Sequence, residues 1–334
     1  MPSPVSSHTY TRKNVVCHPL RQSPSLLHNN LSVHNNTMAY ARDRDVYLTT
    51  FGSNRLTQLP FRDPVPIFSL EFLPLADGAV LCIGMQDGFQ LWAADSFRMV
   101  YFHALHPSDT DVCYASSSHA LSPTAFLVGD STGAMHTFEG GGDRGGSSSY
   151  KNLTSVRNHQ ATITSISRGD KIVASGDSFG AVAVYDISPS LATEGLSTNT
   201  LTVRRLVNVA QSPVTRLLSS TAFLIAAFAD GSVKVLNNEL KMRVSINAHA
   251  RAISSMDIDE MSGVFLTAGE DSTLCVWTVP TGEEGTVDLV MADSVPDRLV
   301  TGAKFLTDGY EEKKIVASCY DHDQVIVWNR KEND

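Results

Sequence analysis

Short apolar runs recur along the chain, each followed by a turn rich in Gly, Asp and Ser and then by a stretch in which apolar and polar residues alternate. This pattern predicts a strand, a tight turn and a second strand. It occurs at residues 81–92, 126–138, 173–185, 225–236, 266–277 and 316–328. The chain is therefore expected to be all-β and built from repeated hairpins.

Each copy ends in a large apolar residue, and the spacing of these residues gives the size of the repeat. They are Trp92, Phe138, Tyr185, Leu236, Trp277 and Trp328, at intervals of 41 to 51 residues. A propeller blade of four strands occupies about 40–45 residues. Two stretches rich in Gly, Ser and Thr, about 139–155 and 187–200, account for the longer intervals, and we expect them to be flexible loops.

A seventh copy is expected at the start of the repeat. One period before Trp92 lies the alternating stretch Asp45–Leu48, which follows another short apolar run. We expect a degenerate first copy within about residues 26–60. The sequence leaves open whether this copy forms a complete blade.

The last copy has too little chain after it to complete a blade. Only residues 329–334 follow Trp328, too few for a turn and an outer strand at ~3.3 Å per residue. We expect the apolar stretch 13–20 to pair beside Val325–Trp328 and close the ring, so that no sheet edge is left free. The expected organisation is a flexible tail over residues 1–12 and one seven-bladed propeller over residues 13–334.

Residues 249–277 resemble the WD40 repeat family. They carry His249, Thr267, Asp271 and Trp277 at the positions of that family's His, Ser/Thr, Asp and Trp. The resemblance implies a WD40 β-propeller in which these four side chains form a hydrogen-bonded chain inside one blade. Such a chain gives a buried Trp N–H the acceptor that it needs.

The copy at residues 159–185 resembles the repeat less closely. It keeps His159 and Ser175, but Phe179 stands at the family's Asp position and Tyr185 at its Trp position. The stretches 29–33, 88–92, 99–105, 246–253 and 268–272 also resemble one small family within this class. That resemblance implies an interaction role and names no target.

Charge and cysteine content narrow the function classes. Lys and Arg number 26 against 35 Asp and Glu, a net charge of -9, which disfavours a general attraction to nucleic acid or to an anionic membrane. The five cysteines include no C-x-x-C pair, as is typical of a reducing compartment. The longest apolar stretch is far shorter than the ~20 residues of a spanning helix. We expect a cytoplasmic protein, associated in one interpretation with a cilium or flagellum, that inserts into no membrane.

Two motifs could indicate a serine hydrolase. Residues 129–133 and 176–180 both match G-x-S-x-G, with Ser131 and Ser178 as the candidate nucleophiles. Neither motif is followed by a helical pattern, and both fall at the hairpin turn of the repeat, so a β-turn is the favoured interpretation. The pair His103 and His106 matches no known metal-site spacing. We expect no catalytic residue, no cofactor and no metal.

The family resemblance implies that partners dock on the loops around the propeller axis. By their place in the repeat, the candidate contact residues are Arg251, Glu270, Gln160, Ser178 and Ala229. Arg251 is the strongest of these, because arginine is frequent at interface hot spots and pairs well with carboxylates. The favoured hypothesis is a non-catalytic scaffold or adaptor that presents its loops to a protein or peptide. The alternatives are a subunit of a larger ciliary, flagellar or ubiquitin-ligase assembly, and the serine hydrolase.

Overall fold

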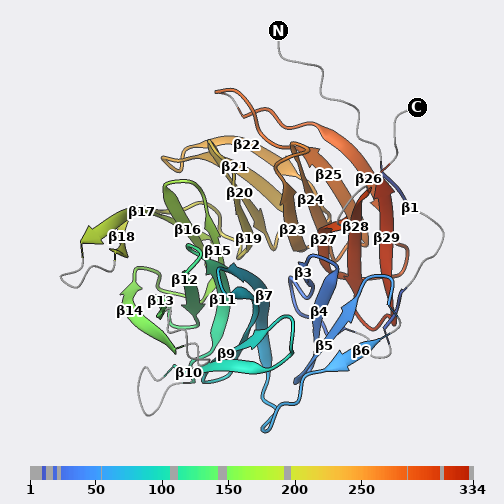
Figure 1. Ribbon diagram of the computed structural model, residues 1–334. Helices are drawn as coiled ribbons and strands as arrows, with labels where there is room; N and C mark the ends of the chain where they lie inside the picture. The colour runs from blue at the N-terminus through green and yellow to red at the C-terminus, as the bar shows by residue number, and fades with distance from the viewer. Residues whose placement is uncertain are drawn as a thin grey trace.

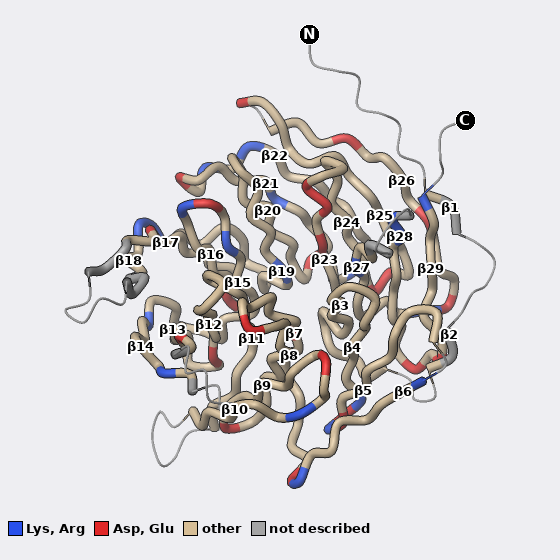
Figure 2. The backbone as a smooth tube through the Cα atoms, viewed as in Figure 1, with Lys and Arg blue, Asp and Glu red and all other residues tan. Residues whose placement is uncertain are grey.

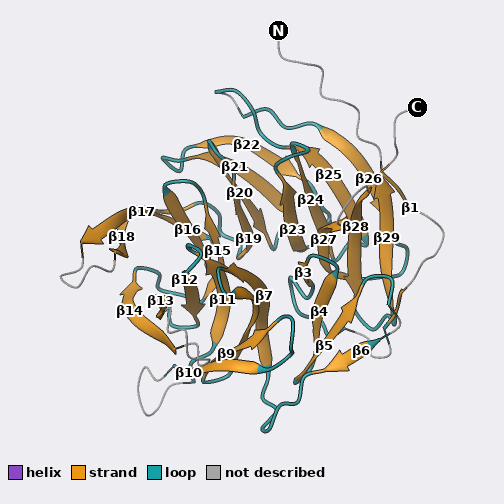
Figure 3. Cartoon of the chain, viewed as in Figure 1, coloured by secondary structure: helices purple, strands orange, loops and turns teal. Residues whose placement is uncertain are grey.

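The computed structural model describes residues 10–12, 18–20, 24–53, 55–105, 112–141, 149–191, 197–283, 285–308 and 312–330. Within these ranges every regular element is a β-strand, as Figure 3 shows. The strands form seven antiparallel sheets arranged like blades around one axis (Figure 1). The prediction of an all-β, seven-bladed propeller is confirmed. The described part of the chain contains no apolar helix of the length that a membrane crossing requires.

Blades 1 to 6 are each built from four consecutive strands. Blade 1 has β3 (Ser32–His34), β4 (Thr37–Arg42), β5 (Asp45–Thr50) and β6 (Leu56–Gln58). Blade 2 has β7 (Ile67–Leu75), β8 (Gly78–Met85), β9 (Gly88–Ala93) and β10 (Met99–Ala104). Blade 3 has β11 (Ala115–Ala120), β12 (Ala125–Asp130), β13 (Ala134–Gly141) and β14 (Ser149–Arg157). The degenerate first copy therefore forms a blade of four strands.

The next three blades repeat this order. Blade 4 has β15 (Ile163–Arg168), β16 (Ile172–Asp177), β17 (Ala181–Leu191) and β18 (Ser197–Asn208). Blade 5 has β19 (Val214–Ser219), β20 (Phe223–Phe228), β21 (Ser232–Asn237) and β22 (Met242–Asn247). Blade 6 has β23 (Ile253–Asp259), β24 (Val264–Gly269), β25 (Thr273–Thr278) and β26 (Leu289–Ser294).

Blade 7 is completed by the N-terminal part of the chain, as Figure 1 shows near the two termini. Its own strands are β27 (Val300–Asp308), β28 (Glu312–Cys319) and β29 (Gln324–Arg330). Both β1 (Tyr10–Arg12) and β2 (His18–Pro19) pair antiparallel with β29. The predicted closure of the ring by an N-terminal strand is confirmed.

The closing strands differ in extent from the predicted stretch 13–20. Pairing begins at Tyr10, inside the segment expected to be a flexible tail, and residues 13–17 lie outside the described part of the chain. The physical reason is burial, because Tyr10 is only 4% exposed and lies against Phe305 with ring centroids 6.4 Å apart. Arg12 pairs with Trp328 and His18 with Val325, so the partner strand is the expected one.

Both stretches expected to be loops are partly strand. Outer strand β14 pairs with β13 as far as Gly141 and Ser149, and β18 pairs with β17 as far as Leu191 and Ser197. Residues 142–148 and 192–196 lie outside the described residues. Polar sequences of this kind can form outer strands because such strands have solvent beside them and need little apolar alternation.

Apolar side chains fill the space between neighbouring blades, and one such cluster joins the two ends of the chain. It comprises Leu20, Leu31, Met38, Tyr40, Tyr47, Leu306, Val316, Val325 and Val327. These residues come from the N-terminal segment, blade 1 and blade 7. The ring is therefore closed by buried apolar area as well as by strand pairing.

Candidate functional site

The innermost strands of six blades share one irregularity that directs side chains towards the axis. In β7, β11, β15, β19, β23 and β27 the register shifts after the first paired residue. A bulge of this kind bends the strand and redirects the side chain at the shift. We call the end of the ring where these strands begin the entry face. It also carries the turns between the second and third strands of each blade, because the strands are antiparallel.

Hydroxyl groups at the bulges link several neighbouring blades. Ser116 donates to the carbonyl of Ile163, and Thr164 donates to the carbonyl of Val214. Ser254 likewise donates to the carbonyl of Val300. Each bond joins the bulge of one inner strand to the first residue of the next, so the inner ends of the blades are held in fixed positions.

A cavity of about 330 Å³ lies on the entry face among these bulges. Phe68, Ser116, Thr164 and Thr215 line it, one from each of blades 2 to 5. Phe68 replaces the hydroxyl of the other blades and stacks on Tyr114, with ring centroids 3.9 Å apart. The cavity, called the axial cavity below, thus combines one aromatic wall with a row of hydroxyl groups.

The segment Pro24–Leu31, which leads into β3, forms another wall of the axial cavity. The N–H of Asn29 donates to the carbonyl of Ser254 at 2.7 Å, and its side-chain amide donates to the carbonyl of Thr215 at 3.2 Å. His28 Nε2 lies 3.0 Å from Glu270 Oε1. The segment therefore bridges blades 5 and 6 across the entry face.

A network of charged side chains lies on the inner strands. Arg216 donates to Glu71 at 2.9 Å, and Lys304 Nζ lies 3.8 Å from Glu71 and 3.5 Å from Asp257. Burial alone would raise the pKa of Glu71, but Arg216 and Lys304 lower it to about 2. Burial lowers the pKa of nearby His119 to about 4, and the two cations add to this effect. Glu71 is thus ionised and His119 neutral at neutral pH.

The four blade-6 residues of the predicted hydrogen-bonded chain lie together. Trp277 Nε1 donates to Thr267 Oγ1 at 2.9 Å, and Thr267 Oγ1 lies 2.8 Å from His249 Nε2. His249 Nδ1 lies 3.0 Å from Asp271 Oδ1. Every donor has an acceptor when Thr267 donates to Nε2 and Nδ1–H donates to the carboxylate. The chain ties the turn before β25 to the loop before β23.

Blade 4 has the same chain with a different aspartate. His159 contacts Ser175 and Asp177, each at 2.7 Å, and Ser175 donates to the Tyr185 hydroxyl at 3.3 Å. The sequence placed Phe179 at the aspartate position, which suggested that the acceptor was missing; Asp177 supplies it from the end of β16. Burial would raise the pKa of Asp177, but hydrogen bonds from His159 and from backbone N–H groups lower it.

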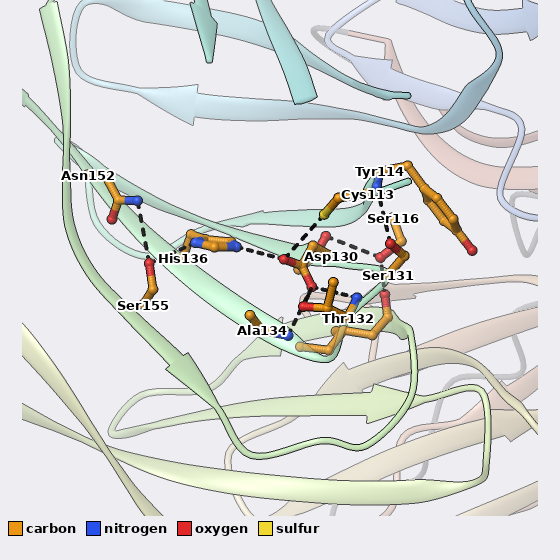
Figure 4. A network of polar contacts seen from close by, with 12 residues as sticks. Cys113, Tyr114, Ser116, Asp130, Ser131, Thr132, Ala134, His136, Asn152 and Ser155 are labelled. Atoms are coloured by element: carbon orange, nitrogen blue, oxygen red, sulfur yellow. Dashed lines mark hydrogen bonds and ion pairs between the residues drawn. The ribbon is translucent and has the colours of Figure 1, made fainter. Parts of the chain in front are cut away.

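Blade 3 has an aspartate-centred network of a third kind, shown in Figure 4. Asp130 accepts from the N–H groups of Thr132 and Ala134 at 2.8 and 3.0 Å and lies 2.9 Å from His136 Nε2. Cys113 Sγ donates to Asp130 at 3.7 Å. Burial and the neighbouring carboxylate raise the pKa of Cys113 to about 11, so this thiol is not an activated nucleophile.

The two candidate hydrolase serines lie in tight turns that continue into strands. Ser131 accepts from the N–H of Tyr114 at 3.2 Å, and the N–H of Ser178 donates to the carbonyl of Thr162 at 2.9 Å. A nucleophile elbow requires a strand followed by a helix. The local geometry is that of a β-turn. The described residues also hold no group of three or more His, Cys, Asp or Glu side chains that could bind a metal, and His106 lies outside them.

The predicted partner-binding residues lie on the loops and turns of the entry face. Arg251 and Gln160 are exposed in the loops that lead into β23 and β15. Ser178 lies in the turn before β17, and Glu270 is held by His28. Of the five candidates, Ala229 lines the axial cavity. The other four do not line it.

The charged network and the Pro24–Leu31 segment were not identified from the sequence. A signal for the charges exists, because four of them occupy the same place, four residues after the first paired residue of their inner strands. They are Glu71, His119, Asp257 and Lys304. Aligning the inner strands, rather than the hairpins that follow them, would have shown this. The folding of Pro24–Leu31 onto the entry face leaves no comparable sequence pattern.

Comparison with known proteins assigns the chain to a family. The model of the WDR54 family matches residues 64–327, which is most of the chain. The chain belongs to the WDR54 family. Mouse WD repeat-containing protein 54 is 24% identical over 322 residues, covering 86% of this chain and 90% of the mouse protein. Rat WD repeat domain 54 is 24% identical over 328 residues, covering 87% and 92%. This is the small family that stretches 29–33, 88–92, 99–105, 246–253 and 268–272 resemble.

A solved structure supports the fold of this WDR54 family member. A chain in the crystal structure of a mitotic checkpoint complex superposes with a TM-score of 0.72 over 99% of this chain and 98% of its own length. The two share 16% sequence identity, so the likeness concerns the fold alone. WD40 propellers generally are protein-interaction scaffolds and not enzymes, and family membership places this chain in that broad class.

Proposed function

We propose that this WDR54 family propeller is a non-catalytic scaffold that binds a segment of a partner protein on its entry face. The observation that carries the proposal is the axial cavity, which has the stacked pair Phe68 and Tyr114 on one side and hydroxyl groups on the others. Arg251 and Gln160 extend the surface outward. Apolar walls with a few convergent polar groups are typical of binding sites.

The size of the axial cavity favours a side chain of a partner over a complete cofactor. Its volume of about 330 Å³ lies at the lower end of small-molecule sites. A partner segment would insert one large side chain between the aromatic wall and the bulge hydroxyls. Its flanking residues would contact exposed loop residues such as Arg251. Binding on rigid bulges and turns requires little ordering of the propeller, and this favours affinity.

Site-specific photocrosslinking tests the proposal. A benzoylphenylalanine residue is placed at Arg251 on the entry face and, as a matched control, at Met261, which is 93% exposed in the turn before β24 at the opposite end. We expect discrete crosslinked bands from position 251 in native extract and none of them from position 261. Tyr114→Asp, which places a charge in the aromatic wall, should abolish these bands. Identical patterns from both positions would contradict the proposal.

The sequence also led to predictions about cellular location, membership in a larger assembly and hydrolase activity. A cytoplasmic location and membership in a ciliary, flagellar or ubiquitin-ligase assembly stay predictions. Size-exclusion chromatography of native extract tests the second, because a peak at the mass of the chain alone would contradict it. A fluorophosphonate probe tests the hydrolase alternative, which requires labelling that Ser131→Ala or Ser178→Ala removes.

A further inference from the structure

A second concave surface lies on the outer side of blade 2. It reaches the entry face at Val65, Met85 and Gln86 but shares no lining residue with the axial cavity. It is a groove of about 660 Å³ between the linker that follows β6 and the outer strands β9 and β10. Trp92 is 5% exposed and stands edge-on to Phe61 of the linker, with ring centroids 5.6 Å apart. Met99 and Phe102 of β10 are each 50% exposed and line the same groove. Its walls are therefore aromatic and sulfur-containing.

The other blades show which of these residues are special to blade 2. The outer strands β10, β22 and β26 begin in the same way. In each blade an N–H group at the end of the third strand donates a hydrogen bond to the carbonyl of the residue just before the outer strand. The donors are Ala93, Asn237 and Thr278. Register then places Met99 of β10 level with Met242 of β22 and Leu289 of β26, which are also exposed. An exposed apolar residue at this first position is thus a recurring feature of the propeller.

The aromatic ring of Phe102 is not a recurring feature, although Leu206 at the same position of blade 4 is also apolar and 44% exposed. The positions that pair with the middle of the third strand are Phe102, Ser245 and Ala292 in blades 2, 5 and 6. Blade 2 alone among these three has a large aromatic side chain there, half of it exposed to solvent. The fold accepts a small residue at this position, so Phe102 is not required by the blade architecture.

The groove also differs in charge from the rest of the molecule. Arg62 and Arg98 line it, both are exposed, and no ion pair of either is found among the described residues, against the single carboxylate of Asp63. The residue level with Arg98 is Lys241 in blade 5 and Asp288 in blade 6. In a chain with a net charge of -9, two such cations beside an apolar groove favour an acidic ligand.

One wall of the groove contains a residue with a strained backbone conformation. Phe97, in the turn between β9 and β10, has a φ of 53° and lines the groove. A bulky residue seldom adopts this left-handed conformation, and a turn could place Gly or Asn there without strain. The conformation directs the ring against the cluster that contains Trp92. The wall is thus held in a shape that does not depend on a bound ligand.

We propose that this groove binds a short acidic segment of a partner protein with one large apolar side chain. The apolar side chain inserts between Phe102, Met99 and the linker, and carboxylates on either side of it pair with Arg62 and Arg98. No residue lines both this groove and the axial cavity, so one propeller can hold a partner segment in each. The groove supplies the second contact that a scaffold needs to bring two proteins together.

Fluorescence anisotropy with labelled octapeptides tests the proposal directly. The panel contains four acidic peptides, Gly-Asp-Glu-X-Leu-Glu-Asp-Gly with X as Phe, Trp, Leu or Met. Two controls accompany it: the Phe peptide with Lys in place of each acidic residue, and the acidic peptide with Ser-Ser in place of the apolar pair. We expect at least one acidic peptide to bind at least ~10-fold more tightly than both controls, and less tightly as salt is raised. No saturable binding by any acidic peptide up to ~1 mM would overturn the proposal.

Substitutions that give blade 2 the residues of other blades locate the peptide-binding site, and the fold tolerates these residues at the same positions elsewhere. Phe102→Ser gives blade 2 the residue of blade 5, and Arg98→Asp gives it the residue of blade 6. Each should weaken binding of the acidic peptide by roughly 5-fold or more at an unchanged melting temperature. Met242→Ser, at the level of Met99 but in blade 5, should leave binding unchanged. Equal affinity of Phe102→Ser and the unaltered chain would place the peptide elsewhere and overturn the proposal.

Discussion

At the scale of single residues, the propeller depends on buried polar side chains that have partners from distant parts of the sequence. Thr267 is fully buried and holds both Trp277 Nε1 and His249 Nε2. In blade 4, Ser175 has the same place between His159 and Tyr185. A buried polar atom that loses its partner costs more than the bond itself was worth.

Replacing Thr267 by Val should therefore destabilise the protein strongly. The change keeps the shape of the side chain but leaves the His249 and Trp277 nitrogens without their hydroxyl partner. We expect the free energy of unfolding to fall by about 1–3 kcal/mol in urea titrations. Thr202→Val, at an exposed position of β18, is the control and should change it by less than about 0.5 kcal/mol. Equal effects of the two variants would contradict a structural role for the chain of hydrogen bonds.

His119 should make stability depend on pH in the mildly acidic range. Its pKa falls from the ordinary 6.5 to about 4 in the fold, mainly because partial burial disfavours the protonated form. Nearby Glu71 raises this pKa, and Arg216, Lys304 and Arg168 lower it further. Between these values the unfolded chain binds a proton that the folded chain does not, so stability falls as pH drops from 6.5 to 4. His119→Gln should reduce this loss by on the order of 2 kcal/mol, measured by urea titration at pH 7 and pH 5. The same pH dependence in both proteins would contradict the assignment.

Glu71 acts in a lower pH range. Its pKa of about 2 lies below the ordinary 4.5, so the stability that its ion pairs provide is present above pH 4.5 and is lost as pH falls towards 2. The two residues lie in one network, and their effects are separated by pH. As pH falls, the protein should therefore first lose the stability linked to His119. Protonation of carboxylates such as Glu71 should then complete the unfolding at lower pH.

At the scale of elements, the turns of the entry face are fixed by contact with the next blade. Gly180, between β16 and β17, has a φ of +84°, and a Cβ there would lie 2.2 Å from the carbonyl oxygen of Ala210. Gly52, after β5, has a similar φ of +81°, but a Cβ at that position would have no other atom within 4 Å. Comparing alanine substitutions at Gly180 and Gly52 therefore separates two losses of stability: the one caused by the left-handed backbone conformation and the one caused by steric crowding of the new Cβ.

Gly180→Ala should thus destabilise the protein more than Gly52→Ala. Both changes incur the left-handed penalty of about 1–2 kcal/mol for an L-residue. Only Gly180→Ala also forces apart the turn of blade 4 and the loop that leads into blade 5. We expect an additional loss of at least about 1 kcal/mol in urea titrations. Equal losses would show that the turn can move away from the neighbouring loop without cost.

The elements that the sequence predicts well are those with local signals. Strand alternation and Gly-rich turns located the second and third strands of the blades, and the WD40 resemblance identified the side chains that meet at His249. Outer strands such as β14 and β18 were missed because they are polar and need little alternation. The role of Asp177 was missed because the acceptor comes from the strand end, two residues before Phe179, in this blade.

The candidate site was harder to predict than the fold because it is assembled from many blades. The axial cavity combines one residue from each of several bulges with the Pro24–Leu31 segment, and no single stretch of sequence contains it. The groove on blade 2 depends on a linker that packs against a different strand pair. Such sites follow from the closure of the ring, which local patterns do not encode.

At the scale of the whole molecule, the ring is a chain of similar units whose stability depends on contact between the first and the last. Blades 1 to 6 each bury their faces against a neighbour along the sequence. Blade 7 meets blade 1 through a cluster of residues from both ends of the chain and through hydrogen bonds of Asn30 with Thr301 and Ser318, while β1 and β2 cover β29. Figure 2 shows acidic and basic positions distributed around the described part of the ring. Apolar packing, strand pairing and hydrogen bonds together close the ring.

Removing the closing strands should destabilise the entire propeller. Deletion of residues 1–20 removes Leu20 from the cluster between blades 7 and 1 and Tyr10 from the cluster between blades 6 and 7. It also leaves the β29 edge unpaired, so we expect a lower melting temperature and aggregation through that edge. Deletion of residues 1–9 is the matched control, because it leaves both strands in place, and it should melt as the full chain does. Loss of closure also removes a constraint on the segment Pro24–Leu31 that lines the axial cavity. The longer deletion should for that reason weaken entry-face crosslinking at Arg251 even at temperatures where most of the protein is still folded. An unchanged melting temperature after deletion of residues 1–20 would show that the blades hold the ring together without their N-terminal strands.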